Sequence, residues 1–436
     1  MRNKFLFIIT FLFINLLAIQ AQETSLISMD DVLTKVQENN YTIKISEKDL
    51  KAAKADYNQT NAILLPNIAV SHTGISTTNP LMAFGSKLNQ ENLTQADFNP
   101  ALLNDPDETK NFATKIEVQQ PIFNADGIFM RKAAKSKVEA FELQSERTKD
   151  YISLEVKKAY MQLQLAYKAV EVLEKAKQAA LENKSVAENN FKQGYMQKSD
   201  LLSVEVHVTE VENQLQNAKS NINNASDYLK FLMNDESEIT LKPTDDLNAN
   251  IDLSIYNEVI SGNRADIEAM EKSTEAYLNM HKSNKLSYLP RLNAFGSYEL
   301  YDDKVFGTNA KGYLVGAQLS WNVFEGFKRI GKTQKSKAEL DKAQLNLDQY
   351  KSQSQLEYNK AKRQLKDAEN TLHLTELAVE QSKEALRIRT NRFKQGLEKS
   401  SDLLISETQY LKKQLDYLQT VFNYNYTKAY VEFLTK

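Results

Sequence analysis

Four stretches of the chain alternate between apolar or small side chains and polar ones. Alternation with a period of two residues predicts β-strands whose two faces differ. The predicted strands cover about residues 66–76, 111–123, 290–301 and 312–324. Their length suits strands that cross a bilayer, but a soluble hairpin with one buried face would show the same alternation. The pattern alone leaves both interpretations open.

Two long stretches, one after each pair of strands, lack every residue that breaks a helix. The chain has only twelve Gly and seven Pro, and none of them falls within residues 128–193 or 332–395. Both stretches are rich in Ala, Leu, Lys, Glu and Gln, which favour helix. They predict helices over about residues 126–192 and 325–394, each roughly 100 Å long at 1.5 Å per residue.

The first long stretch also has the spacing of a coiled-coil seam. Its apolar residues recur after alternating steps of four and three positions, as a helix packed along a second helix requires. The seam consists of Ile152, Val156, Ala159, Leu163, Ala166, Val170 and Leu173. Thr375 and Ser382 interrupt the equivalent seam of the second stretch. Helices of this length must lie against other long helices, for which we expect the return helices 200–234 and 402–435.

A shorter helix is predicted before each pair of strands. The first covers about residues 27–65, where Ser28 can cap its start and a Leu-Pro pair ends it. The second covers about residues 252–289 and ends at another Leu-Pro pair. A polar linker at residues 241–251 separates the two sets of elements.

The sequence FKQG-x4-SDLL occurs at residues 191–202 and again at 393–404. A repeat of this kind defines the architecture of a chain. Each copy lies where a long helix ends and a return helix begins, so the motif predicts the tip of a helical hairpin. We expect Gly194 and Gly396 to adopt the left-handed conformation that ends a helix.

These duplicated elements define two structural repeats, over residues 22–240 and 252–436. Residues 1–21 have the pattern of a signal peptide, with two basic residues, an apolar run and Ala21 at the expected cleavage site. An uncleaved anchor is the alternative. No later stretch of about 18 apolar residues exists, so we expect the mature chain to enter a membrane, if at all, only as strands.

The connection between the first two predicted strands is long, from about residue 77 to residue 110, whereas the second connection is short. Its apolar residues are too numerous for a disordered segment, so it is expected to pack as a lid or against a neighbouring subunit. These residues include Met82, Phe84, Leu88, Phe98, Leu102 and Leu103.

One segment fits the pattern of a phosphate-binding loop. Residues 326–333 read GFKRIGKT, which matches G-x4-G-K-[ST]. No apolar strand ending in Asp follows to hold Mg²⁺, and the corresponding segment of the first repeat lacks the motif. We therefore do not expect nucleotide binding at this segment.

No other pattern indicates catalysis, a cofactor or a bound metal. The chain has no Cys, and its four His and nine Met are scattered without the spacing of ligands. Its formal net charge is only −2, which gives no reason to expect nucleic acid as a partner. We expect a protein that is not an enzyme.

Two aspartates follow the predicted tips. Asp200 and Asp402, with the serines before them, can cap the return helices. Alternatively, both face the lumen of a helical tube, where several copies would form an acidic ring that filters or gates ions.

The order of these elements resembles the TolC-like outer-membrane efflux protein family over about residues 27–436. The specific signals are NRADI at 263–267, QPIF at 120–123 with a looser counterpart at 321–324, the Leu-Pro entries to the strands, and the two FKQG tips. The resemblance implies a mainly helical homotrimer with a small β part. Each chain would give four strands to a shared twelve-stranded outer-membrane β-barrel and its long helices to an α-barrel in the periplasm.

The resemblance also implies a function. The chain would be the exit duct of a tripartite efflux or type I secretion system, surrounded by outer-membrane lipid. It would pass substrates outward from a periplasmic adaptor, or membrane fusion protein, and an inner-membrane pump. The residues that would dock the adaptor are Gln193, Gly194, Tyr195, Gln395, Gly396 and Leu397.

The gate of the family has partial counterparts here. By the resemblance, Asp402 corresponds to an aspartate that faces the lumen at the closed end of the family's channels. Asp200 corresponds to the equivalent position of the first repeat, which links parts of the gate. Ile405 stands where a second aspartate is expected, and Glu398 stands where some members have a basic residue. A double acidic ring and the same gate salt bridge are therefore not expected.

The principal alternative is a periplasm-spanning coiled-coil protein or adhesin stalk without transport. It would explain the seams but neither the four alternating strands nor the duplicated tips. The residues do not distinguish efflux of drugs from efflux of metals or secretion of proteins, although no Met or His cluster favours metal.

Overall fold

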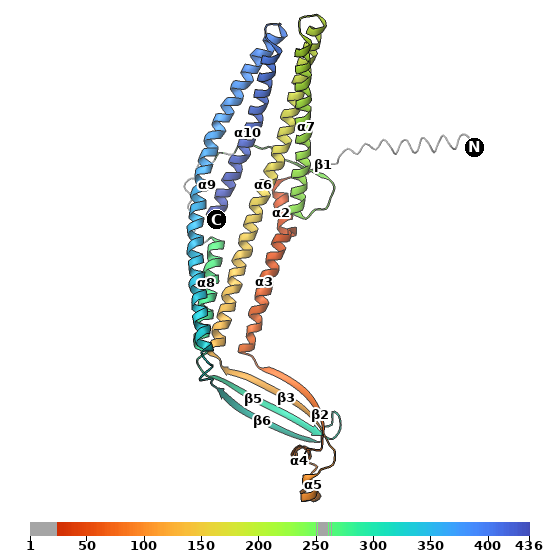
Figure 1. Cartoon of the computed structure of the whole chain (residues 1–436), viewed down its shortest axis with the longest axis vertical. Helices are drawn as coiled ribbons and strands as arrows, with labels where there is room; N and C mark the ends of the chain where they lie inside the picture. Colours follow the sequence, from red (N-terminus) through yellow and green to blue (C-terminus); the bar gives the residue numbers. More distant parts are fainter. Residues whose placement is uncertain (1–23, 250, 252–259, 261, 263) are drawn as a thin grey trace, which may run out of the picture. The chain divides into compact units, whose positions relative to one another are not determined.

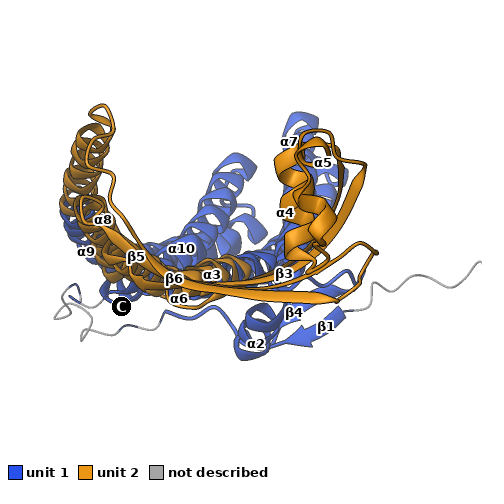
Figure 2. Ribbon diagram, turned by 90° about the horizontal axis from the view of Figure 1, so that it is seen from below, with its two compact units in different colours: residues 1–47, 144–266, 350–436 blue, residues 48–143, 267–349 orange. Residues whose placement is uncertain are grey.

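The computed structural model describes residues 24–249, 251, 260, 262 and 264–436, so the predicted signal peptide lies outside the described residues. The chain divides into two compact units, and each unit combines segments of both sequence repeats (Figure 2). Unit 1 comprises residues 1–47, 144–266 and 350–436, and unit 2 comprises residues 48–143 and 267–349.

Four long helices form two helical hairpins, as predicted (Figure 1). The first hairpin consists of α6 (Ala125–Lys192) and α7 (Lys198–Met233). The second consists of α9 (Lys328–Lys394) and α10 (Ser400–Thr435). Among the described helices, none is both long enough and apolar enough to cross a membrane.

The predicted seam of α6 lies in the core of unit 1. All its residues from Ile152 to Leu173 belong to one hydrophobic cluster, to which α7 contributes Val211 and the short helix α2 (Met29–Asn39) contributes Val32. Burial of each large aliphatic side chain stabilises the fold by roughly 1.5–3 kcal/mol. The seam is therefore confirmed as the line along which α6 packs.

The predicted helix over residues 27–65 is wrong in one respect, because it is broken at Asn40. α2 ends just before this residue, and α3 (Tyr41–Gln59) with the 3₁₀ helix η1 (Thr60–Ile63) follows it. The Asn40 side-chain carbonyl accepts two backbone N–H bonds from the start of α3, at 2.9 and 3.3 Å. Its amide donates to the Leu232 carbonyl (2.8 Å) at the end of α7. The buried Asn40 is thus a break of one residue between α2 and α3.

The start of α2 agrees with the prediction. Ser28 and Asp31 form a capping box, in which each side chain binds the backbone N–H of the other residue. In the second repeat, α8 (Ala265–Leu286) confirms the predicted helix over most of its described part, but it ends three residues before the predicted end. Residues 252–259 of that prediction lie outside the described residues.

The segment predicted as a polar linker is partly a strand, which is a correction. β4 (Thr240–Pro243) pairs in parallel with β1 (Thr24–Ile27), a strand that was not predicted. Leu241 is buried, and its N–H donates to the Ser226 hydroxyl of α7 (2.9 Å). Strands of four residues are too short for their alternation to be recognised in the sequence.

Unit 2 contains an antiparallel sheet in the order β2-β3-β5-β6. The strands are β2 (Asn67–Thr77), β3 (Thr109–Phe123), β5 (Arg291–Asp302) and β6 (Ala310–Ser320). All four predictions are confirmed, except that the last strand ends at Ser320 and not near residue 324. After that point the Trp321 indole N–H donates to the Tyr288 carbonyl (3.0 Å), so the chain turns away from the sheet.

The register gathers the apolar positions on one face of this sheet. Across the strands, Val70 pairs with Ile116, Ile116 with Tyr298, and Tyr298 with Tyr313. Because side chains alternate between faces, the residues one position along each strand lie on the opposite face. The two faces therefore differ, as the alternation predicted.

The opposite face is polar near its centre. Lys115 of β3 forms ion pairs with Glu117 of the same strand (2.9 Å) and with Glu299 of β5 (3.6 Å). Strands β2 and β6 each have one side without a neighbouring strand within the described chain. Such open edges are sites for pairing with another chain.

The long connection between β2 and β3 folds into a small helical cap, a name used here for residues 78–108. The cap contains α4 (Pro80–Asn89), the 3₁₀ helix η2 (Gln95–Phe98) and α5 (Pro100–Asn104). Gln90 fixes the cap to the sheet, because its amide donates to the carbonyls of Lys110 (2.8 Å) and Asp302 (3.2 Å).

Candidate functional site at the helical tips

The two tips have the same backbone geometry, which confirms the predicted role of their glycines. Gly194 has φ +77° and Gly396 has φ +70°. At the first tip the Tyr195 N–H donates to the Asn190 carbonyl (2.8 Å), and the Gly194 N–H donates to the Phe191 carbonyl (3.0 Å). The same two bonds recur at the second tip, with both distances 2.9 Å. This pair of bonds is a Schellman motif, in which the left-handed residue is usually Gly.

The predicted capping by Asp200 and Asp402 is wrong. α7 is preceded by Gln197 and α10 by Lys399, and neither residue makes a side-chain cap bond. The return helices begin about two residues earlier than predicted, so both aspartates lie inside the first turn. There a carboxylate is still favourable, since it lies near the positive end of the helix dipole.

The predicted docking residues are all exposed at the tips. Tyr195 is 81% exposed and Leu397 is 64% exposed. Gln193, Gln395 and the two glycines are exposed as well. Large apolar side chains that protrude from a helical tip without a partner in the same chain are typical of a protein contact surface.

The side chains behind the tips differ between the repeats. Phe393 is only 2% exposed, whereas the equivalent Phe191 is 39% exposed. Phe393 packs in a small cluster with Ala187, Val204 and Leu403, to which all four long helices contribute. The two equivalent phenylalanines are therefore packed differently, since the one at the second tip is buried among the long helices and the one at the first tip is exposed.

The second tip has a charged network whose residues are not repeated at the first tip. Glu398 accepts hydrogen bonds from Arg389 (2.7 Å) and Arg392 (2.8 Å), and Arg389 also lies 3.9 Å from Asp402. The equivalent positions of the first tip are Ala187, Asn190 and Met196. Sequence analysis missed Arg389 and Arg392, although comparing the two repeats position by position could have found them.

A buried polar contact joins the two hairpins below the tips. Asn183 of α6 donates to Glu407 Oε1 of α10. His207 Nε2 of α7 lies 3.2 Å from Glu407 Oε2, off the direction of a hydrogen bond. All three residues are buried. Sequence analysis missed this contact, because its three residues come from three different helices.

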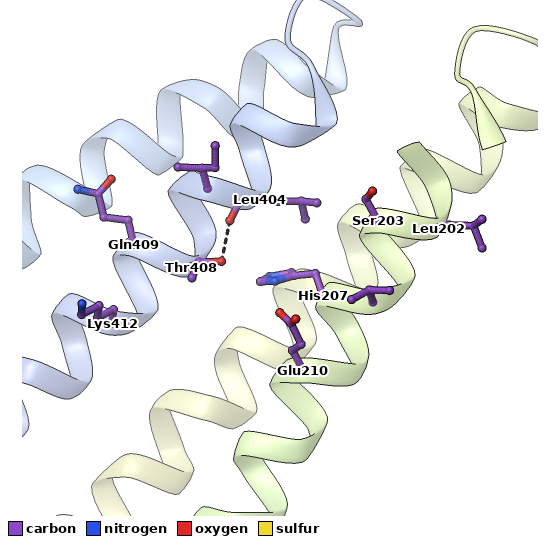
Figure 3. A pocket seen from close by; sticks show the side chains of 10 residues that line it. Leu202, Ser203, His207, Glu210, Leu404, Thr408, Gln409 and Lys412 are labelled. Carbon is purple, nitrogen blue, oxygen red and sulfur yellow. Dashed lines mark hydrogen bonds between the residues drawn. The ribbon is translucent and has the colours of Figure 1, made fainter. Parts of the chain in front are cut away.

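An open groove of about 700 Å³ separates α7 from α10 beside this contact (Figure 3). Figure 3 shows His207 directed into the groove from α7 and Thr408 facing it from α10. The floor and rims combine apolar and polar side chains. They are Leu202, Ser203, Val206, His207, Glu210, Leu404, Ile405, Thr408, Gln409 and Lys412.

The GFKRIGKT segment does not have the geometry of a phosphate-binding loop. α9 begins at Lys328, so Gly331 to Thr333 lie within the helix, where the Gly331 N–H donates to the Phe327 carbonyl (3.1 Å). A phosphate loop requires free backbone N–H groups ahead of a helix. Within the part of the chain that the structure describes, no three His, Asp or Glu residues form a group that could hold a metal ion.

The family model of outer membrane efflux proteins matches residues 32–235 and 258–432, which include both repeats and both tips. The chain belongs to the outer membrane efflux protein family. It is an outer-membrane protein of the efflux class. Members of the family are transport proteins. No curated protein matches the chain by sequence.

Solved structures of outer-membrane channels have the same fold. The outer membrane protein VceC of Vibrio cholerae is similar with a TM-score of 0.79 and 18% identity, over 93% of this chain and 96% of that chain. The CmeC channel of Campylobacter jejuni gives 0.79 and 17%, over 93% and 85%. The MtrE channel of Neisseria gonorrhoeae, in its open state, gives 0.74 and 13%, over 93% and 88%.

Proposed function

We propose that three copies of this chain form an exit duct that receives substrates from a periplasmic adaptor and an inner-membrane pump. The observation that carries the proposal is the duplicated tip, with exposed Tyr195 and Leu397, in a chain of the efflux family. A stalk without transport would not need two matched tips. In this proposal, the pump and not the duct selects the substrate.

The four-stranded sheet supports an oligomer in the membrane. Its apolar face suits contact with lipid, and its Lys115–Glu117–Glu299 face suits a water-filled lumen. Strands β2 and β6 run in opposite directions, since the sheet is antiparallel throughout. The open edge of one copy can therefore pair antiparallel with the other open edge of the next copy and close a ring.

The tips are proposed as the docking site for the adaptor. Gln193, Gly194 and Tyr195 form one contact point, and Gln395, Gly396 and Leu397 form the other. Each point is exposed and rigidly held by its Schellman motif. Such preorganisation lowers the entropy that binding costs.

Asp200 and Asp402 are proposed as charges that face the lumen at the periplasmic end. Asp200 is exposed, and Asp402 is partly exposed with Arg389 at 3.9 Å. The Arg389 guanidinium is shared with Glu398, so it offsets only part of the negative charge of Asp402. Three copies would thus present a weakly acidic ring, with Ile405 in place of a second one.

The docking role is tested by two substitutions at one position. Gly194→Trp adds bulk at the tip, whereas Gly194→Asn keeps a residue that tolerates the left-handed conformation. A Cβ added at Gly194 would meet nothing within 4 Å, so the internal cost of both variants is the strain of the left-handed backbone, which is smaller for Asn than for Trp. We expect Trp to abolish export and Asn to retain it, with trimers formed by both variants.

The readouts are export of a pump substrate from cells and recovery of trimers from outer membranes. Wild-type export by the Trp variant would refute docking through this tip. Loss of export by both variants with normal trimers would assign the effect to backbone strain and would equally contradict the proposal.

A further inference from the structure

The cap helix α4 has two opposite faces. Ala83, Ser86 and Gln90 are buried on one side of the helix, and Gln90 of this side contacts the sheet. Leu81, Gly85 and Leu88 recur at the same helical spacing on the other side. Leu81 is 82% exposed and Leu88 is 55% exposed, and a Cβ added at Gly85 would meet nothing within 4 Å.

An exposed face of this composition is typical of helix packing. Two large aliphatic side chains flank a glycine, which allows the backbone of another helix to approach closely. Two further apolar side chains of the cap are exposed, namely Phe98 in η2 and Leu102 in α5. Apolar surface gathered in one small module indicates an interaction site.

The cap lies over the polar face of the sheet. Gln90 donates to the Asn111 side chain (2.8 Å), and by strand alternation Asn111 lies on the same face of β3 as Lys115 and Glu117. Figure 2 shows α4 and α5 on the concave side of the sheet. The outer face of α4 therefore points away from the strands, into the space that the sheet curves around.

A ring of three sheets would enclose that space. In such a ring the polar, concave face is inside, so the three caps lie around one axis at the same end. Leu81 and Leu88 would then stand in a water-filled lumen unless they meet each other. Contact among the copies removes this apolar surface from water, which is favourable by about 25 cal/mol per Å².

We propose that the three caps of the trimer contact one another through the Leu81–Gly85–Leu88 face of α4 and close the mouth of the channel at the capped end of the sheet. The occupant of this face is thus a second copy of the same chain. This inference rests on the proposed homotrimer. Gln90, which binds both β3 and β5, holds each cap in place for this contact.

Cysteine cross-linking tests the proposal, because the natural chain contains no Cys. Leu88→Cys and Leu81→Cys are made separately, and the matched control is Ile116→Cys. Ile116 is also apolar and exposed, but it lies on the outer face of the central strand β3, away from any second copy of itself. Cells that carry each variant are treated with a short, reducible bismaleimide.

We expect covalent dimers of the chain for Leu88→Cys and Leu81→Cys and only monomer for Ile116→Cys on denaturing gels. Export is expected to fall after cross-linking and to return when the linker is reduced. Substitution of an exposed side chain should leave folding intact, and trimer mass in mild detergent is measured for every variant.

The outcomes separate this inference from the proposed function. Trimers without cross-links at either α4 position would overturn the cap contact and leave the duct standing. Cross-links only to a different protein would assign the face to a foreign partner and overturn it as well. Cross-linked dimers with unchanged export would refute closure of the mouth, whereas absence of trimers in the natural chain would refute the duct itself.

Discussion

Arg264 is only 2% exposed, although it carries a full charge. Its guanidinium forms two hydrogen bonds with the Asp266 carboxylate (2.7 and 3.0 Å) and others with the Ser354 hydroxyl (2.7 Å) and the Leu434 carbonyl. Arg147 lies 3.2 Å from the same carboxylate. Arg264 therefore connects α8 with α9 and with the end of α10.

The protonation of Asp266 follows from these neighbours. Burial raises the pKa of the carboxyl group, but hydrogen bonds from Arg264 and Tyr350 and the charge of Arg147 outweigh this effect. The pKa of Asp266 is therefore lowered below its ordinary value, and the group is ionised at neutral pH. A buried charge of this kind is stable only while its partners are present.

Removing one partner of the buried pair should be costly. We expect Arg264→Met to destabilise the fold by about 3–5 kcal/mol, because it leaves Asp266 with an incompletely paired charge. The measurement is the thermal unfolding of purified protein by circular dichroism.

A matched exposed pair provides the control for Arg264→Met. Arg387 forms two hydrogen bonds with Glu384 (2.7 and 2.8 Å), but both side chains are more than half exposed. Arg387→Met should leave the unfolding temperature nearly unchanged, because exposed ion pairs contribute little to stability. Equal shifts in the two variants would contradict the role of burial.

At the scale of elements, the α6 seam determines how the long helices pack. Leu163 is completely buried within the cluster of unit 1, whereas Leu181, on the same helix, is 40% exposed. The two positions thus have the same residue type, lie on the same helix and have the same helix propensity. They differ only in how deeply the side chain is buried.

Truncation of the seam should therefore depend on position. We expect Leu163→Ala to lower the free energy of unfolding by about 2–5 kcal/mol, since it removes a buried side chain and leaves a cavity. Leu181→Ala should lower it by clearly less. Denaturant unfolding followed by helical circular dichroism distinguishes them, and a similar loss in both would show that α6 does not pack along the seam.

The long helices, the four strands and the left-handed glycines could be predicted because each has a local signal. The absence of Gly and Pro predicts the helices, the period-two alternation predicts the strands, and the repeated motif predicts the glycines. Each signal can be recognised from residues that are neighbours in the sequence. The break at Asn40 could not be predicted, because it depends on a hydrogen bond to Leu232, far along the chain. Asp200 and Asp402 were misassigned as caps for a related reason, since helix boundaries are uncertain by several residues without the cap geometry.

The candidate site was only partly visible in the sequence. The exposed tip residues were identified because the motif is duplicated. The Arg389–Glu398–Arg392 network lies where the two repeats differ, so a search for their shared residues passes over it. The Asn183–His207–Glu407 contact joins α6, α7 and α10, and no spacing rule connects residues on three helices.

At the scale of the whole molecule, the proposed channel would expose the two faces of the sheet to two different solvents. On β6, Val315 lies on the apolar face, and Gln318 lies on the other face because it is an odd number of residues away. Both side chains are exposed within the single chain. Only the assembled channel in its membrane distinguishes the two positions.

A charge placed on either face should reveal this difference. We expect Val315→Arg to reduce the amount of trimer in outer membranes, because a charge on the lipid face costs about 2–4 kcal/mol at the bilayer midplane. Gln318→Arg should leave trimer levels nearly unchanged, since its charge lies in water. The comparison is made by gel electrophoresis of unheated membrane samples, and equal trimer levels would place lipid on neither face.

The difference between the two tips has a consequence for the symmetry of the assembly. The proposed trimer would present six tips in a ring, and their backbones would be nearly equivalent. Their side chains are not, because a tip with the Arg389–Glu398–Arg392 network alternates with a tip that has Ala187, Asn190 and Met196 in its place. The ring of the proposed trimer would therefore be sixfold in outline and threefold in chemistry. A partner built from six identical subunits must bind it in two non-equivalent ways, whereas three partner subunits can all bind alike.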